Sequence, residues 1–127
     1  MNDDQYRQHC QQRFAQFSNT LMTRTNALAD TDSLRELALA FDTMAGQVDD
    51  LYTEGPTLVT RLFETYPDFA PTFPRELLWF LGGDCLHFMP DEEIAIFQQL
   101  EELRDAAVNR GELLDFAAAR AKLMNSQ

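Results

Sequence analysis

Apolar residues recur along this chain every three or four positions, and no stretch alternates apolar and polar positions as a half-buried strand does. The first such stripe consists of Tyr6, Cys10, Phe14, Phe17 and Leu21. Because these positions fall on one helix face, they predict a helix over about residues 4–28. Asp3 or Asp4 is expected to cap its N-terminus, where a carboxylate accepts bonds from free backbone N–H groups.

A second stripe predicts a helix over about residues 34–53. Ser33 and Glu36 have the spacing of a capping box at its start. Gly55-Pro56 is expected to end this helix, with Pro56 in the first turn of the next one, where the missing N–H of proline is not needed. The apolar face of that next helix comprises Leu58, Val59, Leu62, Phe63 and Tyr66.

The segment 67–74 contains three prolines, which predict a rigid and mostly extended connection. We expect Phe69 and Phe73 to pin this connection to the core, because large aromatic side chains gain most from leaving water. Neither side of the connection is large enough to fold comfortably alone, so the segment is not expected to separate two domains.

The most apolar segment of the chain is Leu77–Leu81. A helix that is apolar on all sides is buried on all sides, so we expect a central helix over about residues 75–87. A buried strand is the competing interpretation, and it lacks a second strand candidate with which to pair. Gly82-Gly83 is expected either to kink this helix or to let another backbone pack against it.

Pro90 followed by three acidic residues is typical of a helix start, because the acids lie at the positive end of the helix dipole. The apolar spacing after it predicts a helix over about residues 91–109, and a last helix is expected over about 113–124. The predicted face of the first of these helices comprises Ile94, Phe97, Leu100, Leu103 and Ala107. The fold class is therefore all-α, a single domain over residues 1–127 with five to six helices around the central apolar helix.

Composition supports a real core, since 45% of the 127 residues are hydrophobic and ten are Phe. The net charge of −11 is concentrated in residues 30–109, where four Arg face seventeen acidic residues. Such a surface repels phosphate groups, so we expect neither nucleic acid nor an anionic membrane as a partner. The charge either simply keeps the protein dissolved or forms a surface that docks a basic partner.

Two cysteines are too few for a disulfide framework. The first residues lack the basic flank and apolar run of a signal peptide, and no stretch of 18 apolar residues predicts a transmembrane helix. We therefore expect a cytoplasmic protein.

The segment 82–93 gathers the residues with most chemical potential: Asp84, Cys85, His87 and further acids. Asp84 and His87 are three apart, so a helix would place both on one face. Di-iron proteins use a carboxylate-x-x-His step twice with two further carboxylates, whereas this step occurs once. The simpler interpretation is that these side chains cap a helix break, and no metal site is predicted.

Two other arrangements remain open for the cysteines. Cys10 with His9 and Cys85 with His87 would supply a zinc ligand set, but adjacent helix positions diverge by about 100°. A Cys85–His87 nucleophile pair would need an irregular loop to bring the two side chains together. Cys10 lies on an apolar stripe and is expected in the core, whereas His9 lies off it and is expected to be solvated.

The aromatic-rich middle of the chain, including Trp79, either lines a ligand pocket or forms plain core. The same residues could form a homodimer interface, since aromatic residues and Met are enriched in interfaces. Phe88 and Met89 beside Pro90 are expected to be the most exposed of them.

The leading functional hypothesis is a non-enzymatic interaction or regulatory protein without a cofactor, which presents acidic helix faces to a protein partner or a second copy of itself. Asp49, Asp50, Glu101 and Glu102 are the candidate charged contacts. The alternative is a small-ligand or metal binder, or a minor enzyme, that uses Asp84, Cys85, His87 and Trp79. A DNA-mimicking inhibitor is a third possibility that depends on how the acids are spaced in the fold.

Overall fold

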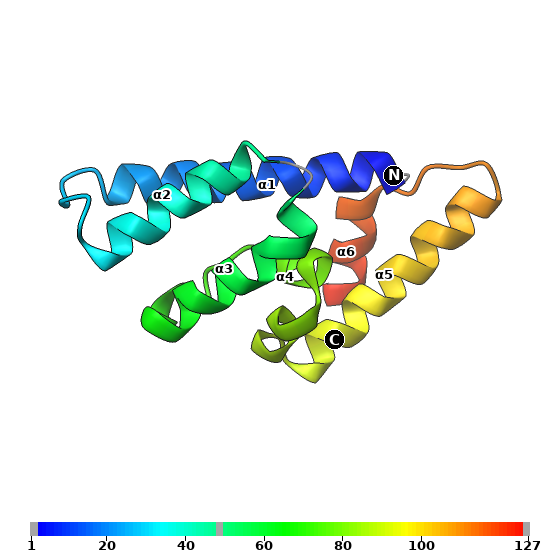
Figure 1. The fold of residues 1–127 in the computed structure, drawn as a ribbon. Helices are drawn as coiled ribbons and strands as arrows, with labels where there is room; N and C mark the ends of the chain where they lie inside the picture. The colour runs from blue at the N-terminus through cyan, green and yellow to red at the C-terminus, as the bar shows by residue number, and fades with distance from the viewer. Residues whose placement is uncertain (1–2, 48–49, 126–127) are drawn as a thin grey trace. The chain divides into compact units, whose positions relative to one another are not determined.

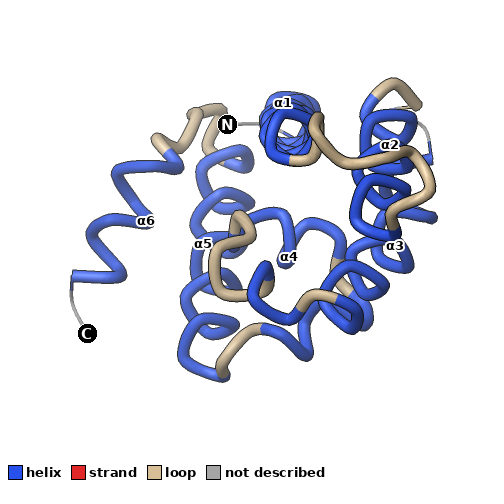
Figure 2. The backbone as a smooth tube through the Cα atoms, turned by 90° about the vertical axis from the view of Figure 1, so that its left-hand side faces the viewer, coloured by secondary structure: helices blue, strands red, loops and turns tan. Residues whose placement is uncertain are grey.

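The computed structural model describes residues 3–47 and 50–125, and over these residues the chain is built of helices and loops without a strand (Figures 1 and 2). This confirms the all-α prediction. The α-helices are α1 (Asp3–Arg24), α2 (Ser33–Ala45), α3 (Leu51–Thr65), α4 (Arg75–Leu81), α5 (Asp91–Asn109) and α6 (Phe116–Asn125). Two 3-10 helices, η2 (Pro67–Phe69) and η3 (Gly83–Phe88), join them. Backbone contacts divide the chain into a unit of residues 10–88 and a unit of residues 1–9 with 89–127.

Helix α1 carries the predicted apolar stripe, and Tyr6, Cys10, Phe14 and Leu21 are all buried. The helix ends at Arg24, earlier than the predicted residue 28. Thr25 is buried just past this end, and its hydroxyl donates a 2.8 Å hydrogen bond to the carbonyl of Leu21. The same carbonyl accepts a 3.1 Å bond from the backbone N–H of Thr25, so the buried hydroxyl finds its partner at a carbonyl of the last helical turn.

The prediction of one helix over residues 34–53 is wrong, because α2 ends at Ala45 and α3 begins at Leu51. The capping-box prediction is also wrong. The N-cap is Asp32, whose carboxylate accepts a 2.9 Å bond from the Leu34 N–H. The Ser33 hydroxyl instead hydrogen-bonds the Tyr66 hydroxyl.

Gly55-Pro56 does not end a helix, contrary to the prediction, and both residues lie inside α3. Gly55 is buried, and a Cβ at this position would lie 3.0 Å from Cδ2 of Leu81 in α4. The glycine therefore permits a close approach between α3 and α4 rather than breaking the chain. Pro56 comes early in the helix, where its missing N–H removes one hydrogen bond without stopping the helix.

The connection 67–74 is not extended as predicted but begins with the 3-10 helix η2 and continues in turns. Phe73 is 1% exposed and its ring packs edge-on against Phe63 at 5.3 Å between centroids. Phe69 is half-buried and its ring faces that of Phe17 at 6.4 Å. The prediction that both rings pin this connection is thus confirmed by their contacts.

The central apolar helix is shorter than predicted, because α4 ends at Leu81 instead of about residue 87. Gly82 has φ +64° and ψ −154°, a backbone conformation that only glycine adopts readily, and the chain continues as η3. Leu77, Leu78 and Leu81 are buried, whereas Trp79 and Phe80 are only half-buried. The prediction that this helix is buried around its whole circumference is therefore wrong.

Helix α5 begins and ends as predicted, whereas α6 begins three residues later than predicted. The buried face of α5 contains Ile96, Phe97, Leu100, Arg104 and Ala107. Leu103, which was predicted on this face, is 43% exposed. Figures 1 and 2 show α6 beside α5, and the guanidinium carbon of Arg120 in α6 lies 5.3 Å from the centre of the Phe97 ring in α5.

Over residues 3–47 and 50–125, every helix is too short or too polar to cross a lipid bilayer.

Candidate functional site

Asp84, Cys85 and His87 all lie on η3, but their side chains face different environments. Asp84 and His87 are 82% and 81% exposed, and Oδ1 of Asp84 lies 4.0 Å from Nε2 of His87. Cys85 lies between them in sequence and is fully buried. The segment therefore pairs two side chains loosely in solvent and does not direct the three toward one cavity.

The Cys85 thiol is poorly suited to nucleophilic chemistry. Burial, together with the charge of Asp84, raises the pKa of Cys85 from an ordinary value of 9.0 to about 11. Because the thiolate is the reactive form, a thiol with this pKa stays protonated and unreactive near neutral pH. The predicted Cys85–His87 pair thus has neither the geometry nor the electrostatics of an activated nucleophile.

Within residues 3–47 and 50–125, no group of three His, Cys, Asp or Glu side chains is placed to hold a metal ion. Cys10 is buried, as predicted from its apolar stripe, and it is a free thiol like Cys85. His9 is half-buried, although it was expected to be solvated.

The aromatic candidates belong to the core more than to a surface. Trp79 is half-buried, and the half-buried Phe88 packs its ring edge-on against Phe63 at 4.8 Å between centroids. Met89 is only 5% exposed, so the prediction that it lies on the surface is wrong. Its flexible apolar chain is removed from water with the other apolar side chains of its unit.

The acidic candidates are on the surface wherever the structure describes them. Asp50 is exposed at the N-cap position of α3, where its side chain makes no capping hydrogen bond. Glu102 is exposed on α5, and the neighbouring Glu101 is half-buried beside Arg104. Asp49 lies outside the described residues.

A family model described as PA2817-like matches residues 2–127 of the chain. The chain belongs to the PA2817-like family. No curated protein and no solved structure gives a match. The polar contacts of this family member are clearest at its arginines.

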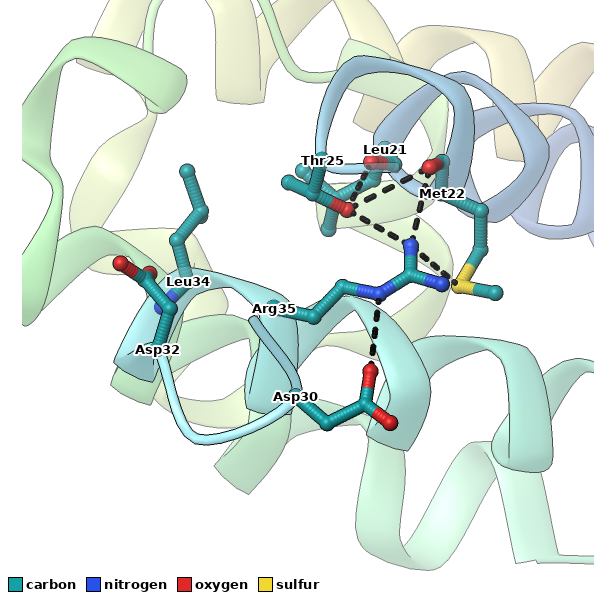
Figure 3. A network of polar contacts seen from close by, with 7 residues as sticks. All are labelled: Leu21, Met22, Thr25, Asp30, Asp32, Leu34 and Arg35. Carbon is teal, nitrogen blue, oxygen red and sulfur yellow. Dashed lines mark hydrogen bonds and ion pairs between the residues drawn. The ribbon is translucent and has the colours of Figure 1, made fainter. Parts of the chain in front are cut away.

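Arg35 of this PA2817-like chain is turned inward at the corner between α1 and α2 (Figure 3). Its Nη1 donates to the Met22 carbonyl at 3.0 Å and to the Thr25 hydroxyl at 3.1 Å. The side chain is 15% exposed, and the nearest carboxylate, that of Asp30, lies 3.7 Å from Nε. Arg35 therefore donates its hydrogen bonds to groups at the C-terminal end of α1, and its contact with Asp30 is a longer ion pair.

Arg75 also donates hydrogen bonds to the backbone. Its Nη1 donates to the Ala70 carbonyl at 2.8 Å, and its Nη2 donates to the Phe88 carbonyl at 2.8 Å. These bonds join α4 to the turn before it and to the end of η3. The arginine thus holds the backbone around the candidate 82–93 segment in place.

Arg104 is a buried charged residue that the sequence pattern did not single out as a candidate. It is buried on α5, hydrogen-bonds the Asp3 carboxylate, and lies 4.9 Å from the centre of the Tyr6 ring. Burial alone would lower the pKa of Arg104, but the Asp3 hydrogen bond and the charges of Glu101, Asp3 and Asp105 raise it above the ordinary value. The sequence does indicate that this arginine is buried, because it falls on the apolar stripe of Phe97, Leu100 and Ala107.

The arginines therefore leave the acidic surface largely uncompensated. Within residues 30–109, Arg75 donates to two backbone carbonyls, Arg35 donates to a carbonyl and a hydroxyl, and Arg104 pairs with Asp3 and Glu101 from a buried position. The exposed carboxylates of α2, α3 and α5 keep their negative charge facing solvent. Because four arginines face seventeen acidic residues in this region, its surface stays strongly negative even though several ion pairs form.

Proposed function

We propose that this protein is a non-enzymatic interaction protein that binds a basic segment of a protein partner through the outer face of α5. The observation that carries the proposal is the arrangement of charge on this helix. Asp91, Glu102 and Asp105 are exposed, while the one arginine of the helix, Arg104, is buried on the opposite side.

Helical spacing places these acids together. Asp91, Gln98, Glu102 and Asp105 follow one another at steps of seven, four and three, which is the spacing of one helix face. The opposite face is fixed by burial, since Phe97 and Leu100 are 1% and 0% exposed. The acidic face of α5 is therefore held rigidly outward.

Apolar side chains on the same helix add contact area for a partner. Leu103 and Val108, which lie to either side of the acidic face, are 43% and 45% exposed. Protein interfaces combine apolar contact with a polar rim, and charge complementarity mainly sets specificity and association rate. A partner segment with Lys or Arg beside apolar residues matches this surface.

A homodimer through this face is disfavoured, because two copies would bring like charges together. A dimer that uses another surface stays a prediction. Leu113 and Met124, which are 62% and 47% exposed, are the apolar side chains of the same unit that it would cover. The mass of the protein in solution, measured by light scattering at low and moderate salt, decides between monomer and dimer.

The alternative, a ligand or metal site made by the 82–93 segment, has less support. Its three side chains diverge, and its thiol is protonated at neutral pH.

The test is affinity capture from native lysate with the intact protein and two matched variants. One variant carries Asp91→Asn, Glu102→Gln and Asp105→Asn on α5. The control carries Asp42→Asn, Glu64→Gln and Asp68→Asn, which change the net charge equally at exposed positions of the other unit. Circular dichroism confirms that each variant remains helical.

We expect the native protein and the control to retain the same basic protein, and the α5 variant to lose it. We also expect retention to fall as salt rises, because exposed charges are screened within about 10 Å at 0.1 M. Equal retention by the two variants, or the absence of a specific partner with the native protein, would contradict the proposal.

A further inference from the structure

A concave site of about 290 Å³ lies between α1 and the connection 67–74, within the unit of residues 10–88. Arg13, Phe17, Thr20 and Arg24 contribute to its wall from α1, at helical spacing. Phe69 and Thr72 contribute from the connection. The volume is near the lower end of the range for small-molecule sites, roughly 300–1,000 Å³.

The charge of this site is opposite to that of the chain. The net charge of the protein is −11, yet two arginines and no acidic residue line the site. Arg13 is already neutralised, because its Nη2 and Nε lie 2.9 Å and 3.2 Å from Oε1 of Glu76, which is 3% exposed. Its charge therefore balances a buried carboxylate.

Arg24 is different. It is exposed in the last turn of α1, and among the described residues no side chain or carbonyl is placed to pair with its guanidinium. A guanidinium presents several N–H donors in a fork that matches a carboxylate or phosphate. Arg24 therefore supplies an available anion-binding group at one end of the site.

The apolar part of the site is preformed. The Phe17 and Phe69 rings meet at 84° with 6.4 Å between centroids. Phe17 is fixed from behind by Phe73 at 4.7 Å and by Phe41 at 5.5 Å. A flat apolar group can therefore contact aromatic rings that need little reordering on binding.

The two threonine hydroxyls on the wall act as acceptors toward a ligand. The Thr20 hydroxyl donates to the Gln16 carbonyl at 3.0 Å, and the Thr72 hydroxyl donates to the Phe69 carbonyl at 3.3 Å. Their remaining lone pairs can accept a hydrogen bond from a ligand N–H or O–H.

We propose that this site binds a small organic acid, with its carboxylate or phosphate head on Arg24 and a flat apolar body against Phe17 and Phe69. The site is separate from the acidic face of α5 and does not depend on the proposed partner. It gives the chain a small-molecule specificity that its net charge would not suggest.

The first test is an NMR titration of the ¹⁵N-labelled intact protein with 3-phenylpropionate and with its neutral amide, 3-phenylpropanamide. We expect 3-phenylpropionate to shift the amides of residues 13–24 and of Phe69, Ala70, Thr72 and Phe73. We also expect it to bind about tenfold tighter than 3-phenylpropanamide, the difference that loss of one charge-assisted hydrogen bond produces. Phenyl phosphate distinguishes the two head groups, since either acid supports the site. Inorganic phosphate tests the apolar body, and it should bind more weakly than both.

The second test compares Arg24→Gln with Arg7→Gln, which removes the same charge from an exposed position of α1 outside the site. We expect Arg24→Gln to weaken 3-phenylpropionate about tenfold and Arg7→Gln to leave it unchanged. Equal loss in both variants, equal binding of the acid and the amide, or shifts confined to other residues would overturn the proposal. Absence of any shift at millimolar probe would also overturn it.

Discussion

At the scale of single residues, Cys85 shows how burial and charge act on the same group. The thiol is fully buried and its pKa is about 11, so at pH 8 about one molecule in a thousand carries the thiolate. We expect alkylation of native Cys85 by iodoacetamide at pH 8 to be at least about 100-fold slower than alkylation of the denatured chain. Peptide mapping by mass spectrometry separates Cys85 from Cys10, and rapid native alkylation of Cys85 would contradict its burial.

The same thiol contributes to the pH dependence of folding. The pKa of Cys85 is raised in the folded state. Below about pH 9 the thiol is protonated in both states, so its titration does not change the free energy of unfolding. Between about pH 9 and pH 11 the unfolded chain loses this proton while the folded chain keeps it, and the free energy of unfolding falls. The free energies of unfolding of the native protein and of Cys85→Ala, measured by urea titration, should therefore converge as the pH rises through this window. A difference that stays constant would show that the thiol does not titrate this way.

The apolar core offers a second prediction at this scale. Leu78 is 0% exposed on α4, whereas Leu113 is 62% exposed. We expect Leu78→Ala to lower the free energy of unfolding by about 2–5 kcal/mol, because it removes buried methyl groups and leaves a cavity. The same substitution at Leu113 should change it by less than about 0.5 kcal/mol, and denaturant unfolding measures both. Similar losses at both positions would mean that α4 is not central to its unit.

Sequence reasoning placed most core side chains but not the charged ones. The stripe of α1 was correct because a regular helix repeats its apolar face faithfully. Arg104 was missed because a charged residue on an apolar stripe is ordinarily read as an interruption, and its partner Asp3 is far away in sequence. The inward turn of Arg35 and Arg75 toward backbone carbonyls likewise depends on tertiary positions that composition does not contain.

At the scale of elements, a glycine follows two of the helices, but only the one after α4 has a backbone conformation that requires glycine. Gly82 follows α4 with φ +64°, whereas Gly46 follows α2 with φ −87° in a region open to any residue. We expect Gly82→Ala to cost about 1–3 kcal/mol because the backbone there is strained for a residue with a Cβ. Gly46→Ala should be neutral or stabilising by up to about 1 kcal/mol, since its Cβ would meet only ordinary contact at 3.5 Å. Thermal unfolding of both variants measures this difference, and a larger loss at Gly46 would reverse the assignment.

Helix boundaries were predictable where capping signals were local. Pro90 and the acids after it marked the start of α5 correctly. The break between α2 and α3 was invisible, because Met44 and Leu51 are seven residues apart and remain on one helical stripe across the gap. Gly55 was misread because its requirement, the close approach of Leu81, exists only in the folded chain.

At the scale of the whole molecule, uncompensated negative charge should oppose folding. The net charge is −11, and in residues 30–109 four arginines face seventeen acidic residues. Added salt screens repulsion between exposed carboxylates, so we expect the melting temperature to rise by several degrees between about 0.01 M and 0.15 M NaCl at pH 7. The rise should vanish near the isoelectric point of about 4.4. A melting temperature that falls with salt at pH 7 would show that ion pairs outweigh repulsion.

The all-α class and the acidic middle of the chain followed from the sequence, since helical periodicity and charge counts are properties of the sequence itself. The candidate chemistry of the 82–93 segment did not survive in the form that its residue types suggested, because η3 turns Cys85 inward and leaves Asp84 and His87 in solvent. The arginine-lined groove joins residues 13–24 to residues 69–74, and only the fold brings them together.

The bond between Arg104 and Asp3 spans 101 residues and joins the first turn of α1 to α5 within one unit. On the ribosome, residues 10–88 can therefore complete their own contacts while the rest is still being made. The first turns of α1 have to wait for α5 to emerge before Asp3 finds its cation. Until translation reaches that point, the Asp3 carboxylate lacks the guanidinium that it meets in the finished unit.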